Sequence, residues 1–148
     1  MHKTLIVVDD ISGFTLPDQT ILTFKDYLDE FPKRNEPKTR VINLCDTSRY
    51  LSQGYYCSLL AQARQHRVLP SVKTINDLRI ADEGSARLPL PDKFKWPVTE
   101  GIESFFVLFG KTKDQALLPV AATAFEAFPC PILQVTLHIA ADNIGFME

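Results

Sequence analysis

The sequence predicts an α/β fold of three-layer, Rossmann-like character, with a mixed sheet that has an antiparallel edge. The first observation behind this prediction is that short, β-rich apolar runs alternate with segments of helical period, which is typical of layered α/β proteins. The second is strict alternation of apolar and polar side chains over residues 133–139, which indicates a strand with one buried face. Antiparallel pairing of this strand with residues 143–147 would make the sheet mixed.

The first part of the chain contains three of the predicted strands. Residues 4–8 form an apolar strand, and residues 20–24 form a second, shorter one. A short helix over residues 26–31 follows and is stopped by Pro32. Residues 40–45 are β-rich and apolar enough for an interior parallel strand.

A helix is expected from Ser52 onward, because the apolar period changes there from that of a strand to that of a helix. Ser52 is the expected N-cap, and Gly54 in the first turn would let another group approach the backbone closely. The side chains expected on the buried face are Tyr56, Leu59, Leu60 and Ala63.

The second part of the chain alternates in the same way. A short strand at residues 68–69 precedes a brief helix over residues 72–78 that Ser71 can cap. Residues 79–101 are predicted to be an irregular loop, because three prolines and mixed charges leave no persistent period. The apolar run at residues 105–109 predicts a central strand, and residues 115–128 predict a helix with Pro119 in its first turn. The apolar stripe of this helix is Leu117, Ala121, Ala124 and Phe128.

Composition limits the classes of protein to which the chain can belong. With 148 residues, of which 45% are hydrophobic, one α/β domain over residues 1–148 is expected. A net charge of -2 argues against a nucleic-acid binder that depends on a strong positive field. No apolar run approaches the length of a membrane span. Three cysteines without metal-ligand spacing, Cys45, Cys57 and Cys130, indicate reduced, mostly buried thiols in a cytoplasmic protein.

The candidate site lies between the strand at residues 40–45 and the following helix. Polar and aromatic side chains gather there, where a strand end and a helix N-terminus form a cradle of N–H groups suited to an anion or a carboxylate. The candidate binding residues are Arg49, Tyr50, Ser52, Gln53, Gly54 and Tyr55. The competing interpretation is structural: Tyr56 belongs to the core, Ser52 serves as a cap, and Arg49 pairs with a nearby acid.

Other motifs point to no catalytic or metal site. Asp9, Asp10 and Asp46 follow predicted strands in a way that resembles the acidic pocket of receiver domains, but residues 11–17 do not continue as the helix that a receiver needs. Gly110 to Thr112 resembles the end of a P-loop, although Phe105 occupies the position of the earlier glycine. No specific nucleophile and base pair, dinucleotide fingerprint or zinc pattern is present.

The central segment also resembles a known family. Residues 41–45 (VINLC), 49–64 (RYLSQGYYCSLLAQAR) and 69–78 (LPSVKTINDL), together with His66, are similar to the N-terminal domain found ahead of RimK-like ATP-grasp ligases, which has a pre-ATP-grasp-like fold. A weaker likeness continues through residues 105–112 and 125–137, so the resemblance covers most of the chain.

This resemblance implies a parent protein that is an ATP-dependent carboxylate-amine ligase, which forms an amide-type bond through an acyl phosphate. ATP and magnesium would bind to an adjoining ATP-grasp domain, in the same chain or a partner chain. The present chain would be a non-catalytic module that assists binding of a small amino-acid or peptide substrate, or organises the domains. The alternative is a stand-alone binding or interaction domain for a small anionic metabolite. A homodimer through exposed strand pairing by the alternating segment at residues 133–139 is a further expectation.

Overall fold

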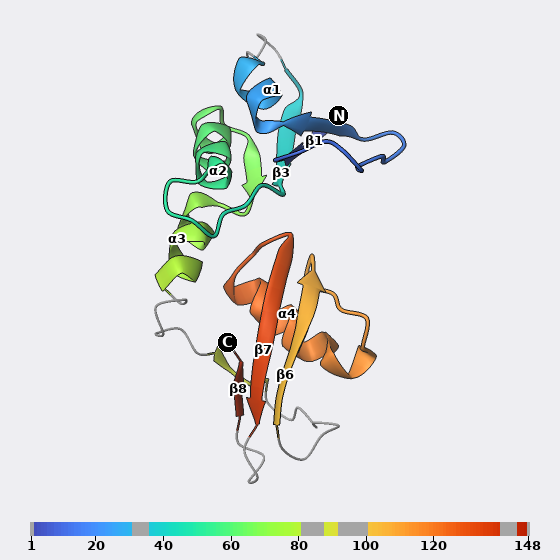
Figure 1. Cartoon of the computed structure of the whole chain (residues 1–148), viewed down its shortest axis with the longest axis vertical. Helices are drawn as coiled ribbons and strands as arrows, with labels where there is room; N and C mark the ends of the chain where they lie inside the picture. The colour runs from blue at the N-terminus through green and yellow to red at the C-terminus, as the bar shows by residue number, and fades with distance from the viewer. Residues whose placement is uncertain (1, 31–35, 81–87, 92–100, 140–144, 148) are drawn as a thin grey trace. The chain divides into compact units, whose positions relative to one another are not determined.

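A computed structural model of the chain describes residues 2–30, 36–80, 88–91, 101–139 and 145–147 (Figure 1). Contacts within the chain divide it into two compact units, Met1–Ile75 and Asn76–Glu148. The prediction of a single domain over residues 1–148 stays a prediction, because this division concerns contacts and not independent folding.

The first unit is built on a parallel sheet of four strands in the order β2-β1-β3-β4. The strands are β1 (His2–Val8), β2 (Thr20–Thr23), β3 (Lys38–Asn43) and β4 (Arg67–Leu69). In the register, Ile6 of β1 lies opposite Ile21 of β2 and Ile42 of β3. Because all four strands run the same way, their carboxyl ends meet at one edge of the sheet, where ligands of open α/β sheets bind.

The core of the first unit lies between this sheet and two helices, α1 (Phe24–Asp29) and α2 (Gln53–Ala63). Val7 and Val41 of the two central strands are fully buried, as is Tyr27 of α1. The buried side chains of this cluster are Leu5, Val7, Tyr27, Val41, Cys45, Cys57 and Ala61. The predicted strands at residues 4–8 and 40–45 are therefore confirmed as the interior strands of the sheet.

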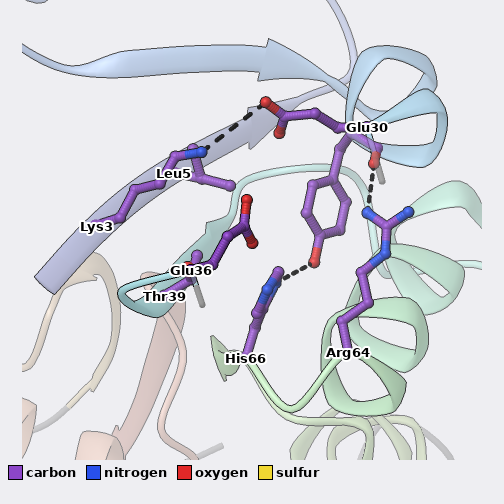
Figure 2. A pocket seen from close by; sticks show the side chains of 8 residues that line it. Lys3, Leu5, Glu30, Glu36, Thr39, Arg64 and His66 are labelled. Carbon is purple, nitrogen blue, oxygen red and sulfur yellow. Dashed lines mark hydrogen bonds and ion pairs between the residues drawn. The ribbon is translucent and has the colours of Figure 1, made fainter. Parts of the chain in front are cut away.

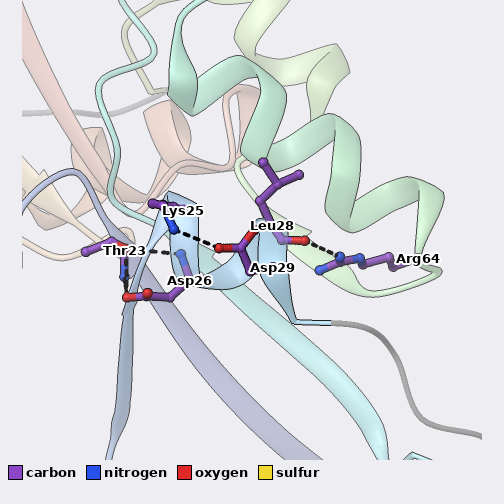
Figure 3. Close-up of polar contacts among 6 residues, drawn as sticks. All are labelled: Thr23, Lys25, Asp26, Leu28, Asp29 and Arg64. Carbon is purple, nitrogen blue, oxygen red and sulfur yellow. Dashed lines mark hydrogen bonds and ion pairs between the residues drawn. The ribbon is translucent and has the colours of Figure 1, made fainter.

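Helix α1 (Phe24–Asp29) is only six residues long and is held by contacts at both ends (Figure 3). Thr23 and Asp26 form a capping box, in which the Asp26 N–H donates to Thr23 Oγ1 over 3.2 Å. Lys25 Nζ lies 2.9 Å from Asp29 Oδ2. Arg64 of α2 donates to the carbonyl oxygens of Tyr27 and Leu28, at 2.6 and 3.1 Å. Since a helix this short is unstable alone, these contacts and the burial of Tyr27 maintain it.

Helix α2 (Gln53–Ala63) begins at the predicted N-cap: Ser52 Oγ accepts a hydrogen bond from the Tyr55 N–H. Its buried face, however, was predicted only in part: Leu60 packs against the core, but Ala63 is exposed. Tyr56 and Leu59 are each 43% exposed. The side chains that are buried instead are those of Gly54, Cys57, Ser58 and Ala61. These residues follow helical spacing but are small, so the helix lies close to β3 and leaves Tyr56 and Leu59 toward solvent.

The predicted strand and helix after α2 are both confirmed. Strand β4 pairs with β3 in parallel, with Leu69 opposite Ile42. Helix α3 (Val72–Ile80) carries the chain from the first unit into the second. Ser71 caps it, because its hydroxyl accepts a hydrogen bond from the Thr74 N–H over 3.1 Å.

The second unit contains an antiparallel sheet of four strands in the order β5-β8-β7-β6. The strands are β5 (Leu88–Pro89), β6 (Gly101–Leu108), β7 (Ile132–Ile139) and β8 (Gly145–Met147). Helix α4 (Leu118–Ala127) follows a 3-10 turn, η2 (Gln115–Leu117), and crosses one face of β6 and β7 (Figure 1). Pro119 falls in the first turn of α4, as predicted.

The core of the second unit confirms two predicted patterns, the alternation along β7 and the apolar stripe of α4. Along β7, the side chains of Leu133, Val135, Leu137 and Ile139 are buried, in strict alternation. The stripe of α4 also points into this core: Leu117, Ala121 and Ala124 are buried, and Phe128 packs against them. Strand β8 pairs with β7 antiparallel, as expected for the chain end.

The α/β fold class is confirmed, and the arrangement is consistent with a three-layer α/β fold. Two details differ from the prediction. The antiparallel strands form a sheet of their own and not the edge of the parallel one. The run at residues 105–109 belongs to β6, which lies at the edge of the described sheet and not at its centre. Of the predicted loop at residues 79–101, 79 and 80 belong to α3 and 88–89 form β5, while 81–87 and 92–100 lie outside the described residues.

Candidate functional site

The first unit carries an open pocket of about 500 Å³ at the carboxyl ends of its two central strands. The residues that line it are Asp9, Asp46, Arg49, Tyr50, Leu51, Ser52 and Gln53. Asp9 follows β1, Asp46 follows β3, and Ser52 and Gln53 begin α2. We call it the strand-end pocket. Its volume lies in the range of small-molecule sites, about 300–1,000 Å³.

Two carboxylates form one side of the strand-end pocket. Asp9 Oδ2 accepts a hydrogen bond from the Asp46 N–H over 2.8 Å, which joins the ends of β1 and β3. Asp46 Oδ1 accepts one from the Ser48 N–H, also over 2.8 Å. The hydrogen bond from Ser48, together with the charge of Arg49, lowers the pKa of Asp46 below its ordinary value, so this carboxylate is ionised at neutral pH.

Arg49 provides the positive charge of the pocket. Its Nε lies 3.9 Å from Asp46 Oδ2, and its side chain is 87% exposed. An exposed ion pair at this distance contributes little to stability, so the guanidinium can leave Asp46 for a ligand at small cost. The competing interpretation, in which Arg49 pairs with a nearby acid, therefore describes a contact that is present but weak.

The other predicted site residues lie in two places. Tyr50, Ser52 and Gln53 line the pocket beside Arg49. Gly54 is buried behind it: a Cβ at this position would meet the Asp46 carbonyl oxygen, and Thr47 Cγ2 at 2.7 Å. The group that approaches Gly54 is thus the chain's own loop and not a ligand. Tyr55 is half-buried, and its ring packs edge-to-face on Tyr56 at 5.7 Å between centroids.

A buried polar network behind the pocket was not predicted. The Asn43 side chain, at the end of β3, donates to the Gly54 carbonyl oxygen over 2.7 Å and to Ser58 Oγ over 2.9 Å. Its Oδ1 accepts from the Cys45 N–H over 3.1 Å. Ser58 in turn donates to the Pro70 carbonyl oxygen over 2.7 Å. Asn43 and Ser58 therefore fix the start of α2 relative to β3, which sets the shape of the pocket.

The cysteines near the pocket are not arranged as nucleophiles. Cys45 and Cys57 are buried, and a hydrogen bond between their thiols together with burial raises the pKa of Cys45 above its ordinary value. Burial likewise raises the pKa of Cys130. Since the thiolate is the reactive form, the thiols of Cys45 and Cys130 are poor nucleophiles. All three cysteines are free.

A second hollow in the first unit is lined by side chains that include those of Lys3, Glu30, Glu36, Arg64 and His66 (Figure 2). Its volume is about 10 Å³, which is room for about one water molecule. The Tyr27 hydroxyl shares a hydrogen bond of 2.8 Å with His66 Nδ1, and the Arg64 guanidinium lies 4.8 Å from the centroid of the Tyr27 ring. These contacts tie α1 to the end of α2, so His66 has a structural role.

The Tyr27–His66 pair makes stability depend on pH. Burial lowers the pKa of His66 below its usual 6.5. As the pH falls below this value, the unfolded chain binds a proton that the folded chain does not, so the free energy of unfolding decreases. We expect denaturant unfolding of the wild type to show this fall in the free energy of unfolding between about pH 7 and pH 5. The free energy of His66→Gln should depend less on pH, because glutamine keeps an acceptor but does not titrate. Equal slopes for the two proteins would contradict the assignment.

Two kinds of site that the sequence analysis considered, a metal site and a phosphate loop, have a structural answer in the part of the chain that is described. Among those residues, no group of three His, Cys, Asp or Glu side chains could hold a metal ion. Gly110 to Thr112 form a turn, in which Gly110 has a positive φ of 78° and Lys111 bridges back to Leu108. This is a strand-to-helix connection and not a phosphate loop.

Comparison with known proteins assigns the family. A family model described as the RimK-like ATPgrasp N-terminal domain matches residues 24–146, which is most of the chain. The chain belongs to the RimK-like ATP-grasp N-terminal domain family. Neither the curated proteins nor the solved structures with which the chain was compared give a match.

Membership in the RimK-like family has two consequences for the site. The matched residues include all of the strand-end pocket except Asp9. The family description also implies association with an ATP-grasp domain. Among the described helices of this RimK-like domain, none is long and apolar enough to cross a membrane.

Proposed function

We propose that this chain is the non-catalytic N-terminal module of a RimK-like ATP-grasp carboxylate-amine ligase, and that it helps to bind the substrate at the strand-end pocket. Family membership supports the first part. The observation that supports the second is the combination of charges in one pocket: two carboxylates, Asp9 and Asp46, face the same space as the Arg49 guanidinium.

These charges suit an amino acid or a short peptide. An ammonium group would pair with Asp9 and Asp46, and a carboxylate would accept hydrogen bonds from Arg49 and from the N–H group of Gln53 at the start of α2. The positive end of an eleven-residue helix adds to the attraction for the carboxylate. Tyr50 adds an aromatic wall to the same pocket.

The described residues offer no ligand set for magnesium and no phosphate loop, so ATP chemistry is assigned in this proposal to the adjoining ATP-grasp domain. That domain is in the same chain or in a partner chain, and it would supply the acyl phosphate. The present residues would hold the substrate and its charges in place. A cytoplasmic location with reduced thiols is part of the same proposal.

The second candidate function is a stand-alone domain that binds a small anionic metabolite. It is favoured by the exposed Arg49 and the helix N-terminus, which attract anions irrespective of an amino group. The two carboxylates weigh against it, because they would repel a ligand that carries only negative charge. The affinities for an amino acid and for the same acid without its amino group therefore distinguish the two functions.

The proposal is tested by thermal-shift and calorimetric screening of the protein against amino acids, short peptides and the matching carboxylic acids without an amino group. A ligand at roughly 100 times its dissociation constant adds about 2.7 kcal/mol to the free energy of unfolding. We expect an amino acid or peptide to bind, and Arg49→Ala to weaken binding by about tenfold or more, the loss expected for a charged hydrogen bond.

Two variants serve as controls. Arg67→Ala removes an exposed arginine at the other end of the sheet and should leave the affinity unchanged. Asp9→Asn keeps an oxygen for the Asp46 N–H but removes a charge, so it should weaken amino-acid binding more than binding of the acid without an amino group. Preference for the acid without an amino group would favour the second function. A folded protein that binds none of these compounds would contradict the binding role.

A further inference from the structure

Strand β6 presents apolar side chains to solvent at the edge of the sheet. Within the described residues it is the last strand, with β7 on one side only. Val107 is fully buried beneath α4, but Ile102 and Phe106, which point to the opposite face, are 72% and 62% exposed. Edge strands of this kind are usually protected by charges or prolines, because they offer an open template for pairing.

Ile102 and Phe106 also carry backbone N–H and C=O groups that point away from β7, toward the outer side of the sheet. The Phe109 N–H donates to the Pro131 carbonyl oxygen, on the side of β7. Leu108 exchanges both of its hydrogen bonds with Lys111, on the outer side. Because direction alternates along an antiparallel strand, the N–H and C=O groups of Ile102, Ser104 and Phe106 also point outward. Lys111 closes the outer side at Leu108, so the open edge covers residues 102–106.

This edge is complementary to itself. We propose that two copies of the chain pair antiparallel through β6 about a two-fold axis at Ser104. In this register Ser104 lies opposite Ser104 of the other copy, and Ile102 of each copy lies opposite Phe106 of the other. All three pairs are hydrogen-bonded pairs, and the two mixed pairs join β-branched and aromatic side chains, a favourable cross-strand combination.

The side chain at the axis and the charges both fit this pairing. The Ser104 hydroxyl is hydrogen-bonded to Thr136 Oγ1 over 2.9 Å in its own copy, so it requires no partner across the axis. On the other face, Glu103 lies opposite Phe105 of the second copy, so no like charges oppose each other.

A second copy fits this edge better than an unrelated strand, because the apolar residues are placed symmetrically about Ser104 and meet each other after a two-fold rotation. The paired sheets would continue through both copies, with Ile102 and Phe106 covering one another. Only five residues of each copy take part, which limits both the buried interface area and the number of backbone hydrogen bonds. The expected dimer is therefore reversible and depends on concentration.

The test uses sedimentation velocity of the whole chain over a range of concentrations. We expect the wild type to shift from monomer to dimer, and Ile102→Lys and Phe106→Glu each to weaken dimerisation by about tenfold or more, from the loss of two cross-strand pairs. Mixing these two variants should restore a dimer, because one Lys–Glu contact and one native Ile–Phe contact then form. Both positions are exposed, so the variants should remain folded.

Ile132→Lys is the matched control. Ile132 is 50% exposed but belongs to β7, one strand away from the edge. It should leave edge pairing unchanged. If two copies instead associated by stacking their sheet faces, Ile132→Lys would weaken the dimer as strongly as Phe106→Glu. A wild type that stays monomeric, an effect of Ile132→Lys equal to that of the edge variants, or a mixture that fails to restore the dimer would each overturn the proposal.

Discussion

Gly54→Ala is expected to destabilise the protein, although replacing glycine with alanine inside an ordinary helix stabilises it by about 0.5–1 kcal/mol. A methyl group at position 54 would overlap the Asp46 carbonyl group and meet Thr47 Cγ2 at 2.7 Å. The atoms in the way are mostly backbone, so the loop or the helix must move. Overpacking of this kind costs about 1–3 kcal/mol. The free energy of unfolding, measured with denaturant, should fall accordingly.

The control for this prediction is Ala63→Gly, at the exposed end of the same helix. It measures the intrinsic preference of α2 for alanine, with no close contact involved. If Gly54→Ala raised the stability by as much as Ala63→Gly lowered it, close approach of the loop to Gly54 would be refuted. Because Asp46 lies in the strand-end pocket, Gly54→Ala should also lower the affinity for any ligand that binds there.

Asn43→Asp should destabilise the protein by about 3 kcal/mol or more. The substitution replaces the amide group that donates to the Gly54 carbonyl oxygen and to Ser58 Oγ with a second acceptor. The side chain at this position is only 3% exposed, so water cannot provide the missing donors. Burial of a carboxyl favours its neutral form, so the loss should be larger at neutral than at acidic pH. Denaturant unfolding at both pH values measures it.

Asn76→Asp is the matched control, because it makes the same change at a half-buried position where Arg79 donates to the amide oxygen over 2.9 Å. A carboxylate keeps this acceptor, so stability should change by no more than about 0.5 kcal/mol. Similar losses at positions 43 and 76 would mean that the buried network has no special importance.

The sequence predicted those elements whose pattern has a single structural solution. Strict alternation over residues 133–139 left one assignment for β7, because a shift of one residue would expose Leu133, Val135 and Leu137 together. The stripe on α4 was equally clear, since large and small apolar residues share one face.

The errors have a common physical cause. In α2 the largest apolar residues, Tyr56 and Leu59, suggested a buried face, but close approach to β3 selects small side chains. The apolar run of β6 suggested a central strand, although an edge strand with one uncovered face carries the same composition. Periodicity identifies a face as apolar, and it does not say how near the neighbouring element lies.

The sequence predicted the positions of some of the residues that line the strand-end pocket, and their role in binding stays a prediction. Arg49, Tyr50, Ser52 and Gln53 line one pocket because strand, loop and helix follow each other directly in the sequence. Asp9 joins them through the pairing of β1 with β3, which no local pattern reveals. The buried Asn43 carried one available signal: an amide at the end of an otherwise apolar strand requires partners.

The most direct test of the binding site is amide NMR of the protein titrated with the best amino acid or peptide from the screen. The predicted result is that shifts cluster at Asp46 to Gln53 and at Asp9, and that Arg49→Ala requires about tenfold more ligand to reach them. Shifts confined to other parts of the chain, or shifts that persist unchanged in Arg49→Ala, would contradict a substrate site at the strand-end pocket.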